Sequence, residues 1–189
     1  ETIYLAIYAY PRGELKRQLI SYLRQADGKR PKRTQSNVRR ERYPAQLSIH
    51  LRPPEVADRL VPGHWESDLI MGANNRSAVA TMVERTSRYV ILAKLEAPTA
   101  EAAAEAIVRE MSRMAPSLLK TMTHDQGSEM ARHAEITART GMKIYFADPH
   151  SPWQRGSNEN TNGLLRQYLP KGTDLSLVTQ ARLDEIADL

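Results

Sequence analysis

The chain has 189 residues, a net charge of +5, five histidines and no cysteine. This length allows one well-buried core with attached elements, and the lack of cysteine excludes a disulfide framework. No apolar run approaches the roughly 20 residues of a membrane span, and no two histidines have the spacing of a zinc-ligand pair. The composition therefore predicts a soluble, cytoplasmic protein with one main domain, no membrane contact and no zinc site.

The N-terminal part is predicted to be helical. Apolar side chains recur at helical spacing in residues 2–10 and 13–25, and Pro11-Arg12-Gly13 interrupts the pattern. The chain opens without a starter Met or an obvious helix cap. We therefore expect a short helical piece whose upstream part is missing.

Positive charge is concentrated in the first third of the chain. Residues 1–60 contain 13 Lys and Arg against 6 Asp and Glu, whereas residues 61–189 contain 14 against 16. The basic residues of the segment 28–43 are Lys29, Arg30, Lys32, Arg33, Arg39, Arg40 and Arg42. Such a segment can neutralise phosphates and release counterions, so we expect it to contact nucleic acid. The alternative is a solvated linker whose charge only aids solubility.

The following segment predicts an α/β core. In chain order, its elements are strands at 64–72, 77–84 and 88–95, a helix from Pro98 to about Met114, a strand at 120–124, a helix at 128–139 and a strand at 142–146. The first three strands form an antiparallel meander, and the later alternation implies parallel crossovers. With a further helix at the end, this is the order of the ribonuclease H-like fold, a mixed five-stranded sheet flanked by helices. The predicted boundaries are a helical piece at 1–27, a basic linker at 28–60, the core at 61–175 and the start of a C-terminal helical part at 176–189.

Three acidic residues have distinctive surroundings in this core. Asp68 lies in the first strand, Asp125 follows the fourth strand, and Glu159 lies on the helix after the fifth. Because active sites of α/β folds form at the carboxyl ends of strands, we expect the three carboxylates to meet there. Carboxylate oxygens suit hard cations, so the predicted cofactor is two Mg²⁺ or Mn²⁺ ions per site.

Each of these residues also has an ordinary structural interpretation. Asp68 could be an outward-facing strand residue, Asp125 a turn or helix-capping residue, and Glu159 a stabiliser of a helix N-terminus. Glu66 shares a strand face with Asp68 and is interpreted as a surface residue or a supporting contact, with a metal ligand as the alternative. Trp153 is interpreted as a core or loop anchor.

Two sequence blocks resemble IS30-family transposases. They are Pro62-Gly63-His64-Trp65-Glu66-Ser67-Asp68-Leu69-Ile70 and Ser151-Pro152-Trp153-Gln154-Arg155-Gly156-Ser157-Asn158-Glu159-Asn160, which continues through residues 162–172. The resemblance covers residues 44–175 and implies a DDE enzyme of the retroviral-integrase superfamily, with Asp68, Asp125 and Glu159 as catalytic and metal-binding residues. The 33 residues between Asp125 and Glu159 match the family's spacing. The family's second motif commonly reads Trp-Asp-Asn-Gly, whereas this chain has His124-Asp125-Gln126-Gly127.

The resemblance also implies an activity and partners. The activity is metal-dependent cleavage of insertion-sequence ends and strand transfer into target DNA, by a bacterial protein associated with the nucleoid. The partners are the terminal inverted repeats, the target DNA and, because two DNA ends are paired, a second copy of the chain or a larger assembly. The start of the chain resembles the end of the family's helix-turn-helix region.

Several residues outside the acidic triad are predicted to contact DNA. Arg166 follows Glu159 by seven positions, about two turns along one helix face, and is expected to hold a phosphate near the ions. The alternative for Arg166 is a plain surface arginine. Arg155, Asn160 and Lys171 are the other predicted contacts in this region, with a solvated loop as the alternative for Arg155 and Lys171. A metal-dependent nuclease of the same fold and a catalytically defective DNA-binding fragment are the alternative functions.

Overall fold

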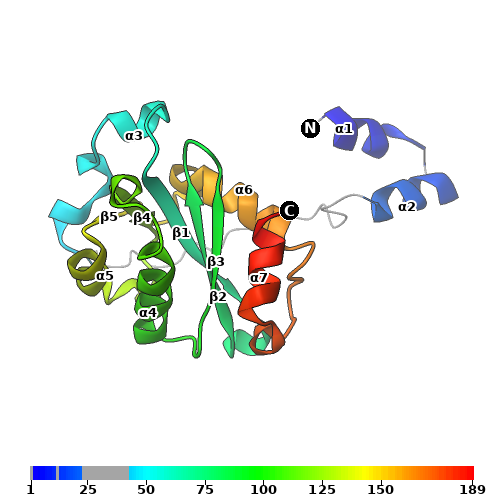
Figure 1. Cartoon of the computed structure of the whole chain (residues 1–189). Coiled ribbons are helices and arrows are strands. Elements are labelled where there is room, and N and C mark those ends of the chain that lie inside the picture. The colour runs from blue at the N-terminus through cyan, green and yellow to red at the C-terminus, as the bar shows by residue number, and fades with distance from the viewer. Residues whose placement is uncertain (1, 12, 23–42) are drawn as a thin grey trace. The chain divides into compact units, whose positions relative to one another are not determined.

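A computed structural model of the chain describes residues 2–11, 13–22 and 43–189 (Figure 1). The chain divides into two compact units, Glu1–Arg40 and Glu41–Leu189. Within the described ranges, no helix is both long enough and apolar enough to cross a membrane. The predicted DNA-contacting residues Arg30, Lys32, Arg33, Arg39, Arg40 and Arg42 lie outside these ranges.

The first unit contains the two predicted helices, α1 (Thr2–Ala9) and α2 (Glu14–Ser21). Lys16 joins them, because its ammonium group donates hydrogen bonds of 2.7 Å to the carbonyl oxygens of Tyr8 and Tyr10. These bonds satisfy carbonyl groups at the end of α1 that have no partner within the helix.

The second unit is built on a five-stranded sheet. Its strands are β1 (His64–Met71), β2 (Ala78–Glu84), β3 (Val90–Lys94), β4 (Thr121–His124) and β5 (Lys143–Phe146). The strand order is β3-β2-β1-β4-β5, with antiparallel pairing of β1 to β2 and β2 to β3 and parallel pairing of β1 to β4 and β4 to β5. This topology confirms the predicted mixed sheet, and β1, which carries Asp68, is its central strand.

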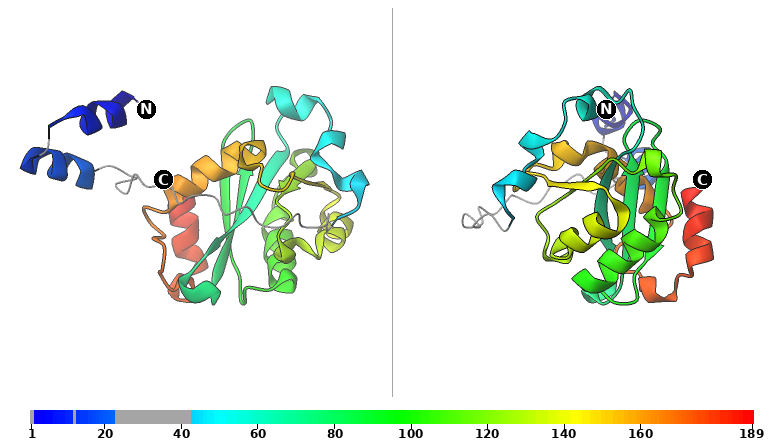
Figure 2. Two further views of the ribbon diagram at one scale, coloured as in Figure 1. Left: turned by 180° about the vertical axis from the view of Figure 1, so that it is seen from behind. Right: turned by 60° about the vertical axis from the view of Figure 1, so that its left-hand side comes forward.

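Helices cover both faces of the sheet (Figures 1 and 2). Helices α4 (Ala100–Met111) and α5 (His133–Thr140) pack on the face that receives Trp65 and Leu69 of β1. Helices α6 (Gly156–Leu165) and α7 (Gln180–Ala187) pack on the opposite face with Ile70. Side chains alternate along a strand, so Glu66 and Asp68 lie on the same face as Ile70, beneath α6.

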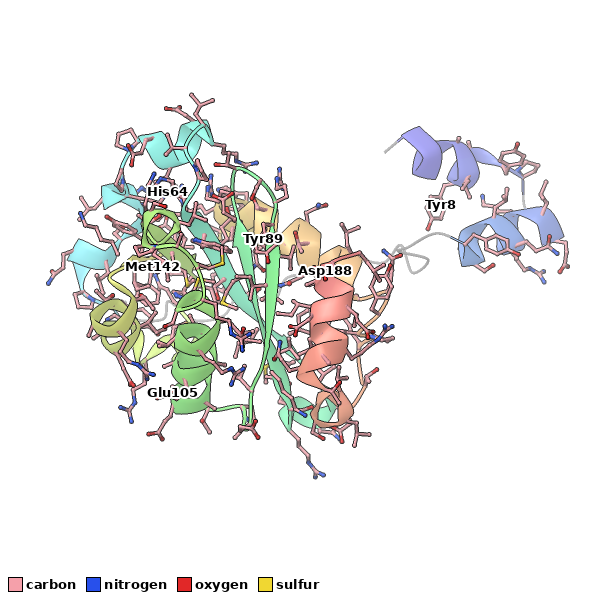
Figure 3. The ribbon with its side chains drawn as sticks, viewed as in Figure 1. Tyr8, His64, Tyr89, Glu105, Met142 and Asp188 are labelled. Atoms are coloured by element: carbon pink, nitrogen blue, oxygen red, sulfur yellow. The ribbon has the colours of Figure 1, made fainter. Side chains whose placement is uncertain are left out.

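Helices α4 and α5 direct apolar side chains toward the sheet and charged side chains toward solvent. Met142 lies in the apolar core and is fully buried, whereas Glu105 lies on the outer side of α4 and pairs with Arg139 of α5 (Figure 3). The N-terminus of α4 is capped by Thr99, whose hydroxyl accepts a hydrogen bond from the backbone N–H of Ala102 at 3.2 Å. This cap explains why the predicted helix begins after Pro98-Thr99.

The folded unit extends beyond the predicted core at both ends. Before β1, the ring of Tyr43 stacks on Phe146 with centroids 3.6 Å apart, and Val56 of helix α3 (Glu55–Asp58) is buried. The segment 43–60 therefore packs against the sheet, although the sequence placed all of it in the linker. Its short turns contain too few apolar residues to produce a readable period.

Helix α7 also belongs to this unit, although the predicted boundary placed it after the core. Leu183 and Ile186 of α7 are buried against Leu92 of β3. The side-chain amide of Gln180 donates to the carbonyl oxygen of Leu92 at 2.7 Å and accepts from the N–H of Lys94 at 2.9 Å. This pairing occupies the backbone groups of an edge strand, which would otherwise remain open to another chain.

Candidate functional site

The register of two parallel strands brings Asp68 and Asp125 to the same level. Glu66 on β1 lies opposite Thr123 on β4. Asp68 and Asp125 each follow two residues later in the chain. Both therefore lie at the same level, toward the carboxyl ends of these two neighbouring strands. The sequence predicted this arrangement from the positions of the two residues on their strands.

Arg155 connects the two carboxylates. Its Nη1 lies 3.3 Å from Oδ2 of Asp68, and its Nη2 lies 3.6 Å from Oδ2 of Asp125. Nη1 also donates to the carbonyl oxygen of Ser67 at 3.1 Å. One guanidinium group therefore faces both aspartates.

This arrangement differs from the predicted DNA contact of Arg155. The residue is only 7% exposed. It ends the 3-10 turn η6 (Pro152–Arg155) immediately before α6, and α6 packs on β1 and β2. The turn therefore directs Arg155 into the protein, whereas the neighbouring Trp153 is 70% exposed and is not a core residue.

The two aspartates are held differently. Asp68, whose side chain is 23% exposed, accepts a hydrogen bond from the N–H of Leu69 at 2.9 Å and one from the amide of Asn162 at 3.3 Å. Burial raises the pKa of Asp68, although Arg155 opposes this shift. Asp125, 41% exposed at its side chain, accepts from the N–H of Gly127 at 2.9 Å, which is the turn role weighed for it.

The structure does not bring Glu159 into contact with this pair. Its side chain is exposed in the first turn of α6. Across the described ranges, no three His, Cys, Asp or Glu residues form a group that could hold a metal ion. Helical spacing nevertheless places Glu159 about one turn before Asn162 of the same helix, and both Asn162 and Arg155, which directly precedes α6, contact Asp68. The backbone of α6 thus presents Glu159 on the stripe that borders Asp68.

A buried polar cluster fixes the start of α6 on the sheet. The carboxylate of Glu66 is fully buried; Arg85 donates to its Oε1, and the backbone N–H of Asn158 donates to its Oε2 at 2.9 Å. The amide of Asn158 donates to the carbonyl oxygens of Glu66 at 3.0 Å and Thr81 at 3.2 Å. Glu66 is therefore a supporting residue rather than a surface one.

The role of Asn158 was not predicted, although the sequence contains a signal for it. The run Asn158-Glu159-Asn160-Thr161-Asn162 is a poor helix former, so contacts outside the helix must stabilise it. Two of its asparagines, Asn158 and Asn162, supply such contacts.

His124 is a neutral packing residue. It is fully buried, and neither ring nitrogen has a hydrogen-bond partner among the described atoms. Burial, assisted by the charges of Arg155 and His133, lowers the pKa of His124 to about 3. The imidazole therefore adds no charge beside Asp125, and its ring lies 6.1 Å from that of Phe146.

The remaining predicted contacts lie along or just after α6. Arg166 is partly buried, and its Nη1 donates to the carbonyl oxygen of Leu169 at 3.3 Å. Burial lowers the pKa of Arg166, and the charge of Asp68 opposes that shift. Asn160 and Lys171 are exposed.

The site has the chemistry of a hard-cation site. The carboxylates of Asp68 and Asp125 already face one positive group, the guanidinium of Arg155. The atoms of both aspartates that could coordinate an ion are oxygens. In addition, the amide oxygen Oδ1 of Asn162 is buried and has no hydrogen-bond partner among the described atoms. An amide oxygen is a ligand that hard divalent cations accept, so the residues present fit such an ion.

The integrase core domain family matches residues 58–152 of the chain. The chain belongs to the integrase core domain family. The chain is 61% identical, over 188 residues, to the transposase for insertion sequence element IS1086 of Cupriavidus metallidurans, and the match covers 100% of the chain and 56% of that protein. It is 42% identical to transposase InsI for insertion sequence element IS30A of Escherichia coli K12, with 99% and 49% covered. The resemblance to IS30-family transposases is thus confirmed, and the chain spans about half the length of these relatives.

Solved structures support the same fold. The integrase core is similar to a chain of the simian T-cell lymphotropic virus intasome, solved in complex with PP2A regulatory subunit B56 gamma, with a TM-score of 0.53 and 18% identity. The match covers 68% of this chain and 48% of that one. At this identity the likeness concerns the fold, and it agrees with the ribonuclease H-like topology described above.

Proposed function

We propose that this integrase core is the catalytic part of a DNA transposase, which cuts the ends of an insertion sequence and joins the freed 3′ end to target DNA. The main support is the placement of Asp68 on β1 and of Asp125 directly after β4 at the same level, where both face a single cationic group. The transposases that are similar to the chain along its whole length support the same assignment.

In this proposal Asp68, Asp125 and Glu159 hold two Mg²⁺ or Mn²⁺ ions. Two such ions supply activation of the attacking water or 3′-hydroxyl and stabilisation of the leaving oxygen during in-line displacement at phosphorus. The protein's own contribution is to orient the ligands. The N–H groups of Leu69 and Gly127 hold one oxygen each of Asp68 and Asp125, and the Glu66–Asn158 contact fixes the helix that carries Glu159.

The DNA contacts follow from the basic residues near this site. Arg166 lies on the same helical stripe as Glu159 and would hold a phosphate, while the exposed Asn160 and Lys171 would contact the strand beyond it. The basic residues of segment 28–43 would add affinity that is independent of base sequence. Because two DNA ends must be joined together, we propose a homodimer or larger assembly on bacterial nucleoid DNA.

Calorimetry with Mn²⁺, followed by a DNA assay, tests this function. We expect wild-type protein to bind Mn²⁺ and the variant Asp125→Asn to lose that binding. The matched control is Asp188→Asn, since Asp188 is exposed just after α7 (Figure 3) and its substitution should leave binding unchanged.

The DNA assay then separates the three possible functions. Products in which a labelled 3′ end is joined to a second duplex support a transposase, whereas cleavage without joining supports a nuclease. DNA binding with neither reaction, and with no effect of Asp125→Asn on Mn²⁺ binding, would replace the proposal with a DNA-binding fragment.

A further inference from the structure

Arg155 is a buried cation at the place where the proposed function requires metal ions. Burying an arginine is costly unless opposite charges and hydrogen bonds compensate for the lost water. Here the compensation comes from Asp68, Asp125 and the carbonyl oxygen of Ser67. The Nε of Arg155 is buried and has no hydrogen-bond partner among the described atoms, so the guanidinium is only partly satisfied.

The charges around Arg155 explain its position. Two carboxylates face it from β1 and from the loop after β4. Without Arg155, Asp68 and Asp125 would repel each other at a partly buried site. The guanidinium therefore does in the metal-free protein what a divalent ion would do, which is to keep the two carboxylates together.

The distances indicate that these contacts are replaceable. Charge-assisted hydrogen bonds between nitrogen and carboxylate oxygen are usually about 2.7–2.9 Å long. The distances from Arg155 to Asp68 and Asp125 are 3.3 and 3.6 Å, and its bond to Ser67 at 3.1 Å does not involve either carboxylate. The side chain can thus lose the aspartates and keep its backbone anchor.

We propose that Arg155 is an internal competitor of the divalent ions: it neutralises Asp68 and Asp125 in the metal-free protein, and an ion binds by displacing its guanidinium from their Oδ2 atoms. This inference rests on the proposed function, because it takes both aspartates as metal ligands. Arg155 acts as a positioning residue that lowers ion affinity. It keeps the carboxylate pair assembled until ions bind.

Calorimetric titration of Mn²⁺ into four proteins tests the competition. Arg155→Gln removes the charge and should bind Mn²⁺ at least about tenfold more tightly than wild type, because a positive charge a few ångströms from the ion is lost. Arg155→Lys keeps the charge but cannot face both carboxylates, so its affinity should lie between the two. The matched control is Arg132→Gln, which changes the net charge equally at an exposed arginine paired with Glu101 and Glu135 and should behave as wild type.

Thermal unfolding supplies a second readout. In EDTA, Arg155→Gln should melt below wild type because the carboxylates repel each other, and Mn²⁺ should raise its melting temperature more than that of wild type. If Arg155→Gln does not fold in either buffer, Arg155→Lys carries the same comparison by calorimetry.

The outcomes separate the inference from the function on which it rests. Wild-type binding that depends on Asp125, combined with equal or weaker binding in both Arg155 variants, overturns the competition and leaves the metal site intact. Absence of Mn²⁺ binding in wild type and in both Arg155 variants overturns the metal site and the inference together. Binding that is detectable only after Arg155 is replaced supports the competition in its strongest form.

Discussion

Glu66 and Asp68 are two carboxylates on the same face of the same strand, and they have opposite surroundings. Glu66 is fully buried, and its two oxygens receive hydrogen bonds from Arg85 and from the backbone of Asn158. Asp68 is partly exposed, and its partners are the weaker contacts to Arg155 and Asn162 and one backbone N–H. Two carboxylates that are two positions apart on β1 therefore differ: both oxygens of Glu66 are hydrogen-bonded inside the protein, whereas the carboxylate of Asp68 is accessible.

This difference shows how one strand can serve both stability and chemistry. A carboxylate whose oxygens are fully bonded inside the protein cannot accept an ion without breaking the fold. A partly exposed carboxylate whose partners are replaceable can exchange those partners for a metal ion. Glu66 thus fixes α6 so that the helix residues facing Asp68 stay in place, and Asp68 remains available for the reaction.

The largest expected effect is on activity at Asp68. Under the proposed function, Asp68→Asn should lower DNA cleavage and joining by about a thousandfold or more, because it removes a ligand charge that stabilises the transition state. The fold should persist, since an amide can still accept from Leu69 and its substitution removes a partly buried negative charge. Cleavage assays together with urea unfolding measure both quantities, and an unfolded variant would contradict the separation of roles.

The next effect is on stability at Glu66. Glu66→Gln should reduce the free energy of unfolding by about 3–5 kcal/mol, because it leaves the buried guanidinium of Arg85 without its counter-charge. Urea unfolding of Glu66→Gln against wild type checks this value. The control is Glu105→Gln, which breaks an exposed pair with Arg139 and should leave the urea midpoint nearly unchanged.

A different result at Glu66 would weaken the comparison. If Glu66→Gln kept wild-type stability but lost Mn²⁺ binding, Glu66 would belong to the metal site. The hydrogen bonds that Glu66 accepts from Arg85 and Asn158 would then not distinguish its role from that of Asp68.

The sequence predicted most of the sheet and the placement of both aspartates. The turn residues Asn74-Asn75 and Thr86-Ser87 are local signals in the sequence that separate the first three strands, and the predicted strands agree with the observed ones to within about two residues. Asp68 and Asp125 then followed from strand order. The exposed position of Glu159 was not anticipated, because it depends on the conformation of a side chain rather than on the helix that carries it.

The environment of η6 could not be read from its own sequence. Local chemistry suggests that Trp153 is buried and Arg155 solvated, whereas Trp153 is 70% exposed and Arg155 is 7% exposed. The reason lies elsewhere in the chain, since the partners of Arg155 include Ser67 and Asp68, more than 80 residues away. Such long-range pairing produces no period within the segment, and the same holds for the packing of residues 43–60.

The smallest expected effect is a pH dependence that distinguishes Asp68 from an ordinary aspartate. Burial raises the pKa of Asp68, Arg155 opposes the shift, and Asp125 adds to it. A raised pKa means that the folded state holds the proton more tightly than the unfolded state does. The unfolding free energy should therefore fall as the pH rises from about 4, the usual Asp value, through the raised pKa.

Asp68→Asn lacks this titration. The difference between its urea midpoint and that of wild type, both measured in EDTA, should therefore increase in favour of the variant as the pH rises over the same range. Glu84 has the opposite behaviour: burial opposes the shift, but hydrogen bonds from Ser87, Gly63 and Thr86 outweigh it and lower the pKa of Glu84, so its stabilisation is lost on acidification. Because both proteins contain Glu84, that contribution cancels in the difference between them. Parallel curves for the two proteins would contradict the raised pKa of Asp68 and would mean that its contacts with Arg155 and Leu69 offset the effect of burial.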